Sequence, residues 1–163
     1  WMDTRGTAEI LTTLAGSAPG FAPVLKPAAH RRATERLAAA RDAQKTGDLA
    51  HALNHASEAA AMAPDQPKAH AMVARLCWAQ FRDTGAPLLD KAHHHAKRAR
   101  DLAPRQHVHH ALLARILNAM GHPETAITSV ERALALAPAK AQPALEADLA
   151  RYRRRENGPR QPD

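Results

Sequence analysis

Three arginines recur at one position of an internal repeat, and they are the residues with the clearest chemistry in this chain. Arg41, Arg75 and Arg115 are 34 and then 40 residues apart. A guanidinium group is planar and donates two parallel hydrogen bonds to a carboxylate, which a lysine ammonium group cannot do. If the three arginines share one surface, they are suited to bind an acidic segment of a partner. The alternative is that they are solvated side chains that keep an alanine-rich protein in solution.

The eleven histidines raise the question of a metal site. The consecutive histidines 93–95 diverge by about 100° from one to the next on a helix, so they cannot share one ion. His51 with His55, and His107 with His110, could each supply only two ligands. A structural zinc site needs four converging ligands, usually including cysteine. We therefore expect the histidines to decorate a solvated outer face, and we expect no metal and no other cofactor.

The sequence lacks the familiar catalytic patterns. It has no glycine-rich phosphate-binding loop, no Gly-x-Ser-x-Gly, no His-Glu-x-x-His and no paired carboxylates on a shared apolar face. Its aspartates and glutamates are predicted to lie on outer faces or in turns, where they balance lysine and arginine. We therefore expect that the chain is not an enzyme.

Three segments that each end in Ala-Pro indicate the elements that must position these side chains. They run over residues 47–64, 91–104 and 121–138. Their final prolines are 40 and then 34 residues apart, and the longer interval is the shorter one with a six-residue insertion. A fixed period near 34 residues is typical of paired helices that stack into a solenoid.

Small residues recur where the two helices of each predicted hairpin cross. Helices approach to the short end of the ~8–10 Å range of axis separations only when no bulky side chain lies between them. Nine alanines occupy these crossing positions in register: Ala40, Ala74, Ala114, Ala52, Ala92, Ala126, Ala59, Ala99 and Ala133. Larger apolar residues are expected to fill the remaining core: Leu37, Val73, Leu113, Met62, Leu102 and Leu136.

Over roughly residues 33–140 this pattern resembles the tetratricopeptide repeat family. The resemblance implies an all-α fold, a right-handed α-solenoid of antiparallel helix pairs. The chain departs from the family where the first helices usually carry large aromatics, because Arg36, His70 and His110 stand there. Aromatic residues make up only 3% of the chain, so each helix buries less apolar area and a modestly stable stack is expected.

The predicted organisation is one stack with flanking segments. Helical hairpins are expected over residues 27–66, 67–106 and 107–140, a capping helix over 141–156 and a disordered tail over 157–163. Pro27 is expected to open the first helix. Residues 1–26, with a short helix near Thr7 to Leu14, either cap the stack or end an upstream domain. The unusual start at Trp1 suggests a piece of a longer chain.

Composition bears on the compartment. Cys77 is the only cysteine, so no internal disulfide can form, which fits a reducing environment. No run of 18 apolar residues and no signal peptide is visible. We expect a cytoplasmic protein without a membrane span.

The resemblance also implies a function, because the first helices of these repeats line a concave groove. On that face the expected partner-binding residues are Arg41, Lys45, Lys68, Arg75, Trp78, Arg115 and Asn118. We expect a non-catalytic protein–protein interaction module, an adaptor or scaffold, that binds an acidic segment or C-terminus of a partner protein there. Trp78 either anchors the ligand or fills core space beside Phe81. The carboxylate-clamp function of some relatives is not carried over, because apolar residues mostly replace its lysines and asparagines.

Two alternatives remain open from the sequence. The chain could be the substrate-recruiting or regulatory domain of a larger enzyme. Its net charge of +7 and pI near 10.3 also suggest nucleic acid as a partner, through an outer basic stripe at Lys91, Lys97, Arg98 and Arg100 and again at Arg151 to Arg155. This alternative is the weaker one, because single-stranded nucleic acids stack on aromatic residues and the groove offers one.

Overall fold

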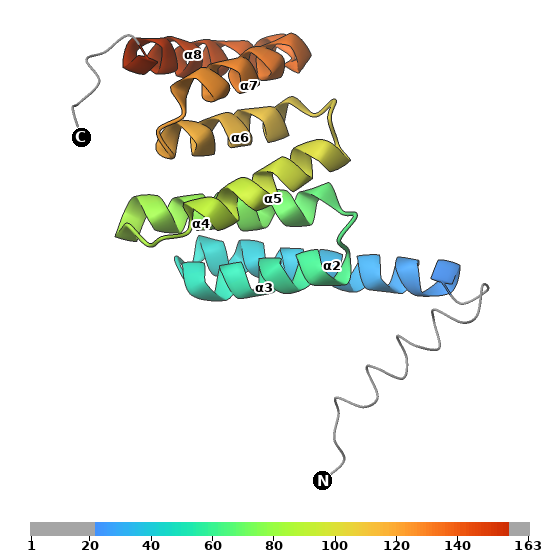
Figure 1. Cartoon of the computed structure of the whole chain (residues 1–163). Helices are drawn as coiled ribbons and strands as arrows, with labels where there is room; N and C mark the ends of the chain where they lie inside the picture. The colour runs from blue at the N-terminus through green and yellow to red at the C-terminus, as the bar shows by residue number, and fades with distance from the viewer. Residues whose placement is uncertain (1–21, 157–163) are drawn as a thin grey trace.

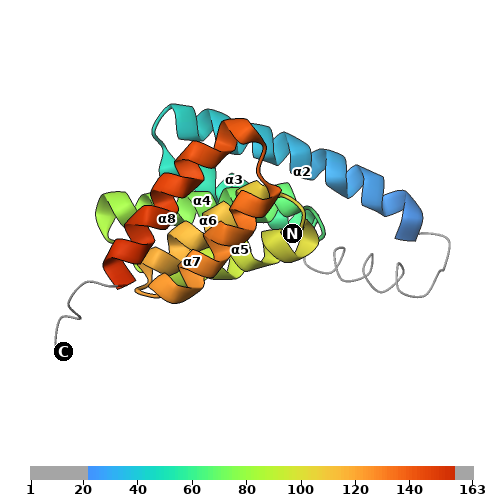
Figure 2. The same cartoon turned by 90° about the horizontal axis from the view of Figure 1, so that it is seen from above.

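The computed structural model describes residues 22–156, which form a stack of helices without β-strands (Figure 1). The elements are α2 (Ala22–Lys45), α3 (Leu49–Met62), α4 (Pro67–Thr84), α5 (Leu89–Leu102), α6 (His107–Ala119), α7 (Pro123–Leu136), the 3₁₀ turn η1 (Ala139–Ala141) and α8 (Gln142–Glu156). Helices α2 and α3, α4 and α5, and α6 and α7 pack as pairs, and α8 packs against α7 (Figure 2). The predicted all-α solenoid is confirmed. In the described residues, no helix is long and apolar enough to cross a membrane.

The alanine crossings form the centre of the stack. All nine predicted crossing alanines are fully buried, with 0% of their surface exposed, and Leu37, Val73 and Leu113 are buried beside them. The prediction for the second set of large apolar residues was wrong. Met62 is 38% exposed, and Leu102 and Leu136 are only partly buried. Each is the last residue of its helix, where no further turn of chain covers it.

The turns within the hairpins depend on glycine. Gly47 and Gly121 adopt positive φ angles of 83° and 85°, and Gly85 ends α4 in the left-handed conformation at φ 71°. Residues with a Cβ atom rarely adopt these angles, so glycine lets the chain reverse direction here. The first helix begins at Ala22, so Pro27 lies inside it rather than opening it. The helix expected near Thr7 to Leu14 and the tail over 157–163 lie outside the described residues.

The terminal helix α8 covers the end of the third hairpin. Leu145 and Tyr152 are buried, and Leu149 packs beside them against the apolar side chains of α6 and α7, including Val130. The predicted face of the capping helix is therefore the one that packs. Covering the last apolar surface is what a terminal helix of a solenoid must do.

Several histidines are buried, contrary to the expectation of a solvated outer face. His70, His109 and His110 are at most 8% exposed. His70 and His110 occupy positions where the family usually has aromatics, so their rings take the same interior space. Each ring also contacts the loop before its helix, because the Nε2 atoms of His70 and His110 lie 3.0 and 2.9 Å from the carbonyl oxygens of Pro64 and Pro104. A buried polar ring is tolerated when it is hydrogen-bonded in this way.

A histidine pair joins the two helices of the second hairpin. The Nδ1 atoms of His70 and His95 are 2.9 Å apart and the rings are stacked, with centroids separated by 5.2 Å. If the Nε2–H group of His70 donates to Pro64, its Nδ1 atom must accept from the Nδ1–H group of His95. The His70 ring is then neutral. The corresponding position of the first hairpin pairs Arg36 with His55 at 3.4 Å.

The surroundings of this pair oppose its protonation. Burial lowers the pKa of His70, as do the charges of Arg98 and His94. Burial, His70, His94 and Lys91 lower the pKa of His95 to about 4. Neither ring gains a nearby carboxylate among the groups that perturb it, so both should stay neutral at pH 7.

The first prediction concerns the helix crossings. Ala92→Leu should destabilise the fold by about 1–3 kcal/mol, because it overpacks a fully buried crossing. Thermal unfolding followed by circular dichroism measures this. The same change at exposed Ala61 is the matched control and should have little effect. An Ala92→Leu protein that melts with the parent would show that this crossing is not tightly packed.

The second prediction concerns acid. The unfolded chain restores the pKa of His95 to its ordinary value of 6.5, so it binds protons before the folded chain as pH falls. Stability that is present above pH 6.5 should therefore be lost between about pH 6.5 and 4. Urea unfolding at pH 7.5 and 5 should show His95 contributing about 1–2 kcal/mol to this loss.

His95→Asn tests the source of that loss, since its amide can donate to His70 but does not titrate. This variant should lose less stability than the parent between the two pH values. His122→Asn, at an exposed histidine, should lose as much as the parent. Equal pH dependence in all three proteins would rule out the histidine pair as the source.

Candidate functional site

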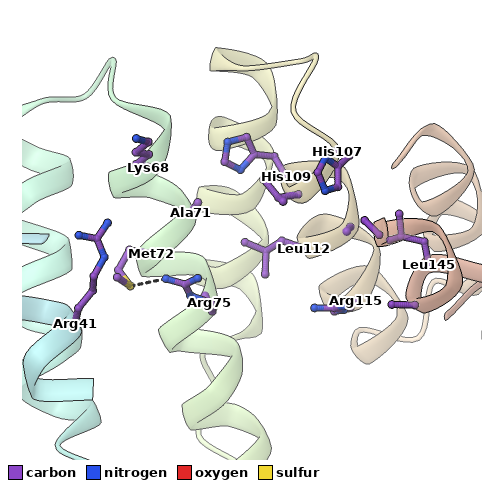
Figure 3. A pocket seen from close by; sticks show the side chains of 14 residues that line it. Arg41, Lys68, Ala71, Met72, Arg75, His107, His109, Leu112, Arg115 and Leu145 are labelled. Carbon is purple, nitrogen blue, oxygen red and sulfur yellow. Dashed lines mark hydrogen bonds between the residues drawn. The ribbon is translucent and has the colours of Figure 1, made fainter. Parts of the chain in front are cut away.

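A cavity of about 480 Å³, here called the groove, opens along one side of the stack (Figure 3). Its walls come from α2, α4, α6, η1 and α8. The lining residues are Arg41, Lys68, Ala71, Met72, Arg75, His107, Val108, His109, Ala111, Leu112, Arg115, Ala141, Ala144 and Leu145. The second helices of the hairpins, α3, α5 and α7, contribute none of these residues. The groove therefore lies along the first helices, as the sequence predicts.

The groove combines apolar and cationic surfaces. Met72, Leu112 and Leu145 supply large apolar groups, while Lys68 and the three arginines supply positive charge. No aspartate, glutamate, serine, threonine, tyrosine or cysteine is among its fourteen lining residues. Such a surface can attract an anion and bury an apolar side chain, and it offers no hydroxyl or thiol nucleophile.

The repeated arginines all reach the groove, from three successive first helices. Arg75 stands on α4, and its Nη2 atom lies 3.0 Å from the Met72 sulfur, as Figure 3 shows. Partial burial and the charge of Arg41 lower the pKa of Arg75. An arginine remains cationic at neutral pH despite such a shift. Among the described residues, no carboxylate lies within ion-pair distance of Arg41, Lys68 or Arg75.

The third arginine differs from the other two, because it forms an ion pair with Asp148 of α8. The Nε atom of Arg115 lies 3.1 Å from one carboxylate oxygen of Asp148, and Arg151 lies 2.6 Å from the other. The side chain of Asp148 is only 13% exposed. The expectation that acidic residues lie on outer faces or in turns was therefore wrong for Asp148. The repeat register could have identified it, because one 34-residue step from Ala114 reaches residue 148.

Three of the predicted binding residues do not line the groove. Lys45, at the end of α2, pairs with Asp42 at 2.9 Å. Trp78 is partly buried against the core, with the guanidinium carbon of Arg82 5.4 Å from its ring centre, which matches its packing interpretation. The side-chain oxygen of Asn118 is buried, and its backbone carbonyl accepts a hydrogen bond from Arg155 at 3.2 Å.

Sequence reasoning missed other lining residues. His107 and His109 come from the first turn of α6, and Leu145 comes from α8. Burial lowers the pKa of His109, and the neighbouring histidines 110 and 107 lower it further. The apolar pattern of α8 predicted that Leu145 packs, but not that it also closes one end of the groove.

Metal ligands do not gather in the described part of the chain. No group of three or more histidine, cysteine, aspartate or glutamate side chains there could hold an ion. His51 instead pairs with Asp48 at 2.6 Å, and His110 uses its Nε2 atom on Pro104. Cys77 is buried, and this burial raises the pKa of its thiol.

Comparison with known proteins gives a match in structure but not in sequence. No protein-family model matches the chain, and no curated protein matches it. The first tetratricopeptide repeat domain of Spaghetti (RPAP3), bound to the HSP90 peptide SRMEEVD, superposes with a TM-score of 0.68 and 16% identity, covering 79% of this chain and 96% of that one.

Two further solved structures are similar. The tetratricopeptide repeat domain of Arabidopsis OM64 has a TM-score of 0.66 and 13% identity, covering 77% of this chain and 98% of that one. The tetratricopeptide repeat protein TTC0263 of Thermus thermophilus has a TM-score of 0.63 and 23% identity, covering 72% of this chain and 62% of that one. Together with the helix pairing and the buried alanine crossings, these matches establish the architecture. The chain has the tetratricopeptide repeat fold, with three helical hairpins followed by a capping helix.

Proposed function

We propose that this chain is a non-catalytic protein-interaction module that binds an acidic segment of a partner protein in the groove. One observation carries the proposal: the groove presents Arg41, Lys68 and Arg75 without a carboxylate among its lining residues. A cation that is partly desolvated and faces other cations gains most when an anion arrives. Burial and the charge of Arg41 lower the pKa of Arg75, which is consistent with a cation that lacks a compensating anion in this environment.

The apolar part of the groove suggests what accompanies the acidic groups. Met72 and Leu112 lie beside the arginines, and Val108 is 48% exposed although it is apolar. A partner side chain such as leucine, valine or methionine would cover this surface at roughly 25 cal/mol per Å² buried. The proposed ligand is therefore a short segment that alternates acidic and apolar residues, rather than an acidic tract alone.

A structural neighbour supports a peptide of this type. The RPAP3 domain is bound to SRMEEVD, which has three acidic residues with Met and Val among them. The peptide thus combines the two chemistries that our groove offers. The same peptide is therefore a suitable ligand with which to test binding to the groove.

Binding rather than catalysis fits the lining of the groove. Acyl or phosphoryl transfer requires a nucleophile, a metal or a positioned general base. The histidines 107 and 109 are the only lining residues of a type that commonly acts as a general base. None of the other lining residues is a serine, threonine or cysteine that such a base could activate. A surface suited to hold another chain supports an adaptor or scaffold role.

The third prediction concerns the central arginine. Arg75→Gln should weaken binding of fluorescently labelled SRMEEVD about tenfold, because it removes a charge-assisted contact at the middle of the groove. Fluorescence anisotropy measures the affinity, and circular dichroism should show unchanged helical content. Raising the salt concentration should weaken the parent more than the variant.

Arg98→Gln provides the matched control, because Arg98 is an exposed arginine on α5, outside the groove. It should leave the affinity for the peptide nearly unchanged. If Arg98 proves decisive and Arg75 silent, the groove is not the binding site. Tighter binding of an oligonucleotide than of the peptide, lost with Arg98, would favour the basic stripe and a nucleic-acid partner instead.

A further inference from the structure

The three repeated arginines are chemically unequal. Arg41 and Arg75 have no carboxylate within ion-pair distance among the described residues, while Arg115 is paired with Asp148 at 3.1 Å. All three nevertheless line the same groove (Figure 3). The chain thus supplies its own acidic group to one of three sites that could each receive a carboxylate from a partner.

The position of Asp148 in the repeat explains how it reaches Arg115. In α2, α4 and α6 the corresponding residue is Ala40, Ala74 or Ala114, and each is fully buried where the helix crosses its hairpin partner. In α8, the last described helix, no following helix of the described chain packs on this position. A longer side chain is sterically allowed there, and it extends back to Arg115 on α6.

The carboxylate of Asp148 is held in place. It is 13% exposed, and it contacts Arg115 and Arg151 through different oxygens. Helix α8 is itself fixed by the buried Leu145 and Tyr152, and by hydrogen bonds of Arg155 to the Asn118 carbonyl and of Arg153 to Glu131. A carboxylate from a partner would meet an Arg115 side chain that is 40% exposed but whose Nε atom is already bound to Asp148. The negative charge of Asp148 offsets part of the attraction there, so the partner's carboxylate gains less at Arg115 than at an arginine without such a neighbour.

We propose that Asp148 determines the specificity of the groove by occupying the third arginine. The inference rests on the proposed function, since it concerns which acidic segments the groove accepts. Partners with acidic groups matched to Arg41 and Arg75 gain their full contacts. A further acidic group directed at Arg115 adds little binding affinity while Asp148 is present. A longer acidic tract therefore should not bind more tightly than one matched to Arg41 and Arg75.

The spacing of a test peptide follows from the stack. First helices of adjacent hairpins are expected to lie roughly 10 Å apart. An extended peptide covers about 3.3–3.6 Å per residue, so acidic residues three apart match successive arginines. The probes are two peptides of equal length that carry either two aspartates or three at this spacing. The two-aspartate peptide has asparagine in place of one terminal aspartate. It is made in two versions, with the asparagine at the N-terminal or the C-terminal position, because an extended peptide can bind in either direction.

The variant Asp148→Asn keeps the size of the side chain and removes its charge. In the parent, the third aspartate should change the affinity less than twofold. In Asp148→Asn it should strengthen binding about fivefold, because Arg115 is released. Adding Arg115→Gln to Asp148→Asn should abolish that gain. The matched control is Glu146→Gln, at an exposed glutamate on the same helix that forms no ion pair among the described residues.

The outcomes separate the inference from the proposed function. If the parent does not bind the two-aspartate peptide, the proposed function fails. Suppose that the parent binds this peptide, but that the third aspartate increases the affinity no more in Asp148→Asn than in Glu146→Gln. Only the role of Asp148 is then overturned. A parent that already binds the three-aspartate peptide fivefold more tightly also overturns that role. Circular dichroism and melting temperature establish that each variant is folded. If Asp148→Asn unfolds, Asp148→Ala removes the charge with the residue that α2, α4 and α6 carry at the corresponding position, and the same gain for the third aspartate is expected.

Discussion

The close crossing of helices at alanine is the constraint on which the rest of this structure depends. At nine positions the two helices of a hairpin meet with no side chain larger than a methyl group between them. These contacts set the helix separation and the rotation of each helix about its axis. Once that rotation is fixed, the residue after each crossing alanine of the first helix, which is Arg41, Arg75 or Arg115, must point to the same side of the stack. The groove is therefore a geometrical consequence of the core.

An alanine-based core buries little area per helix, and polar contacts take over space that aromatics fill in related repeats. The rings of His70 and His110 lie inside the stack and bond to the loops before their helices. This arrangement couples stability to protonation, because burial and neighbouring charges disfavour the protonated rings and no acceptor nitrogen remains between His70 and His95 once both are protonated. A leucine in place of either histidine would bury apolar area without that dependence.

Much of the fold could be predicted from the sequence, because residue size at a fixed period reports directly on helix packing. The positions of Arg41, Lys68, Arg75 and Arg115 in the groove followed from the same register. What could not be predicted depends on contacts between distant segments. Predicting the ion pair of Asp148 with Arg115 requires the angle at which α8 packs on the stack. Predicting that the histidines are buried requires the positions of the loop carbonyls to which they bond. No aromatic residue recurs at the position of Trp78 in the other repeats, so the repeat pattern does not distinguish a packing role from a ligand contact.

Nuclear magnetic resonance of the arginine side chains tests most directly whether the groove receives an acidic segment. The Nε–Hε signals of Arg41 and Arg75 should shift progressively as SRMEEVD is added, while the signal of Arg115, already paired with Asp148, should move little. Signals from Arg98 on α5 should stay in place. Shifts confined to Arg98 and other residues outside the groove, with Arg41 and Arg75 unchanged at saturating peptide, would contradict the account.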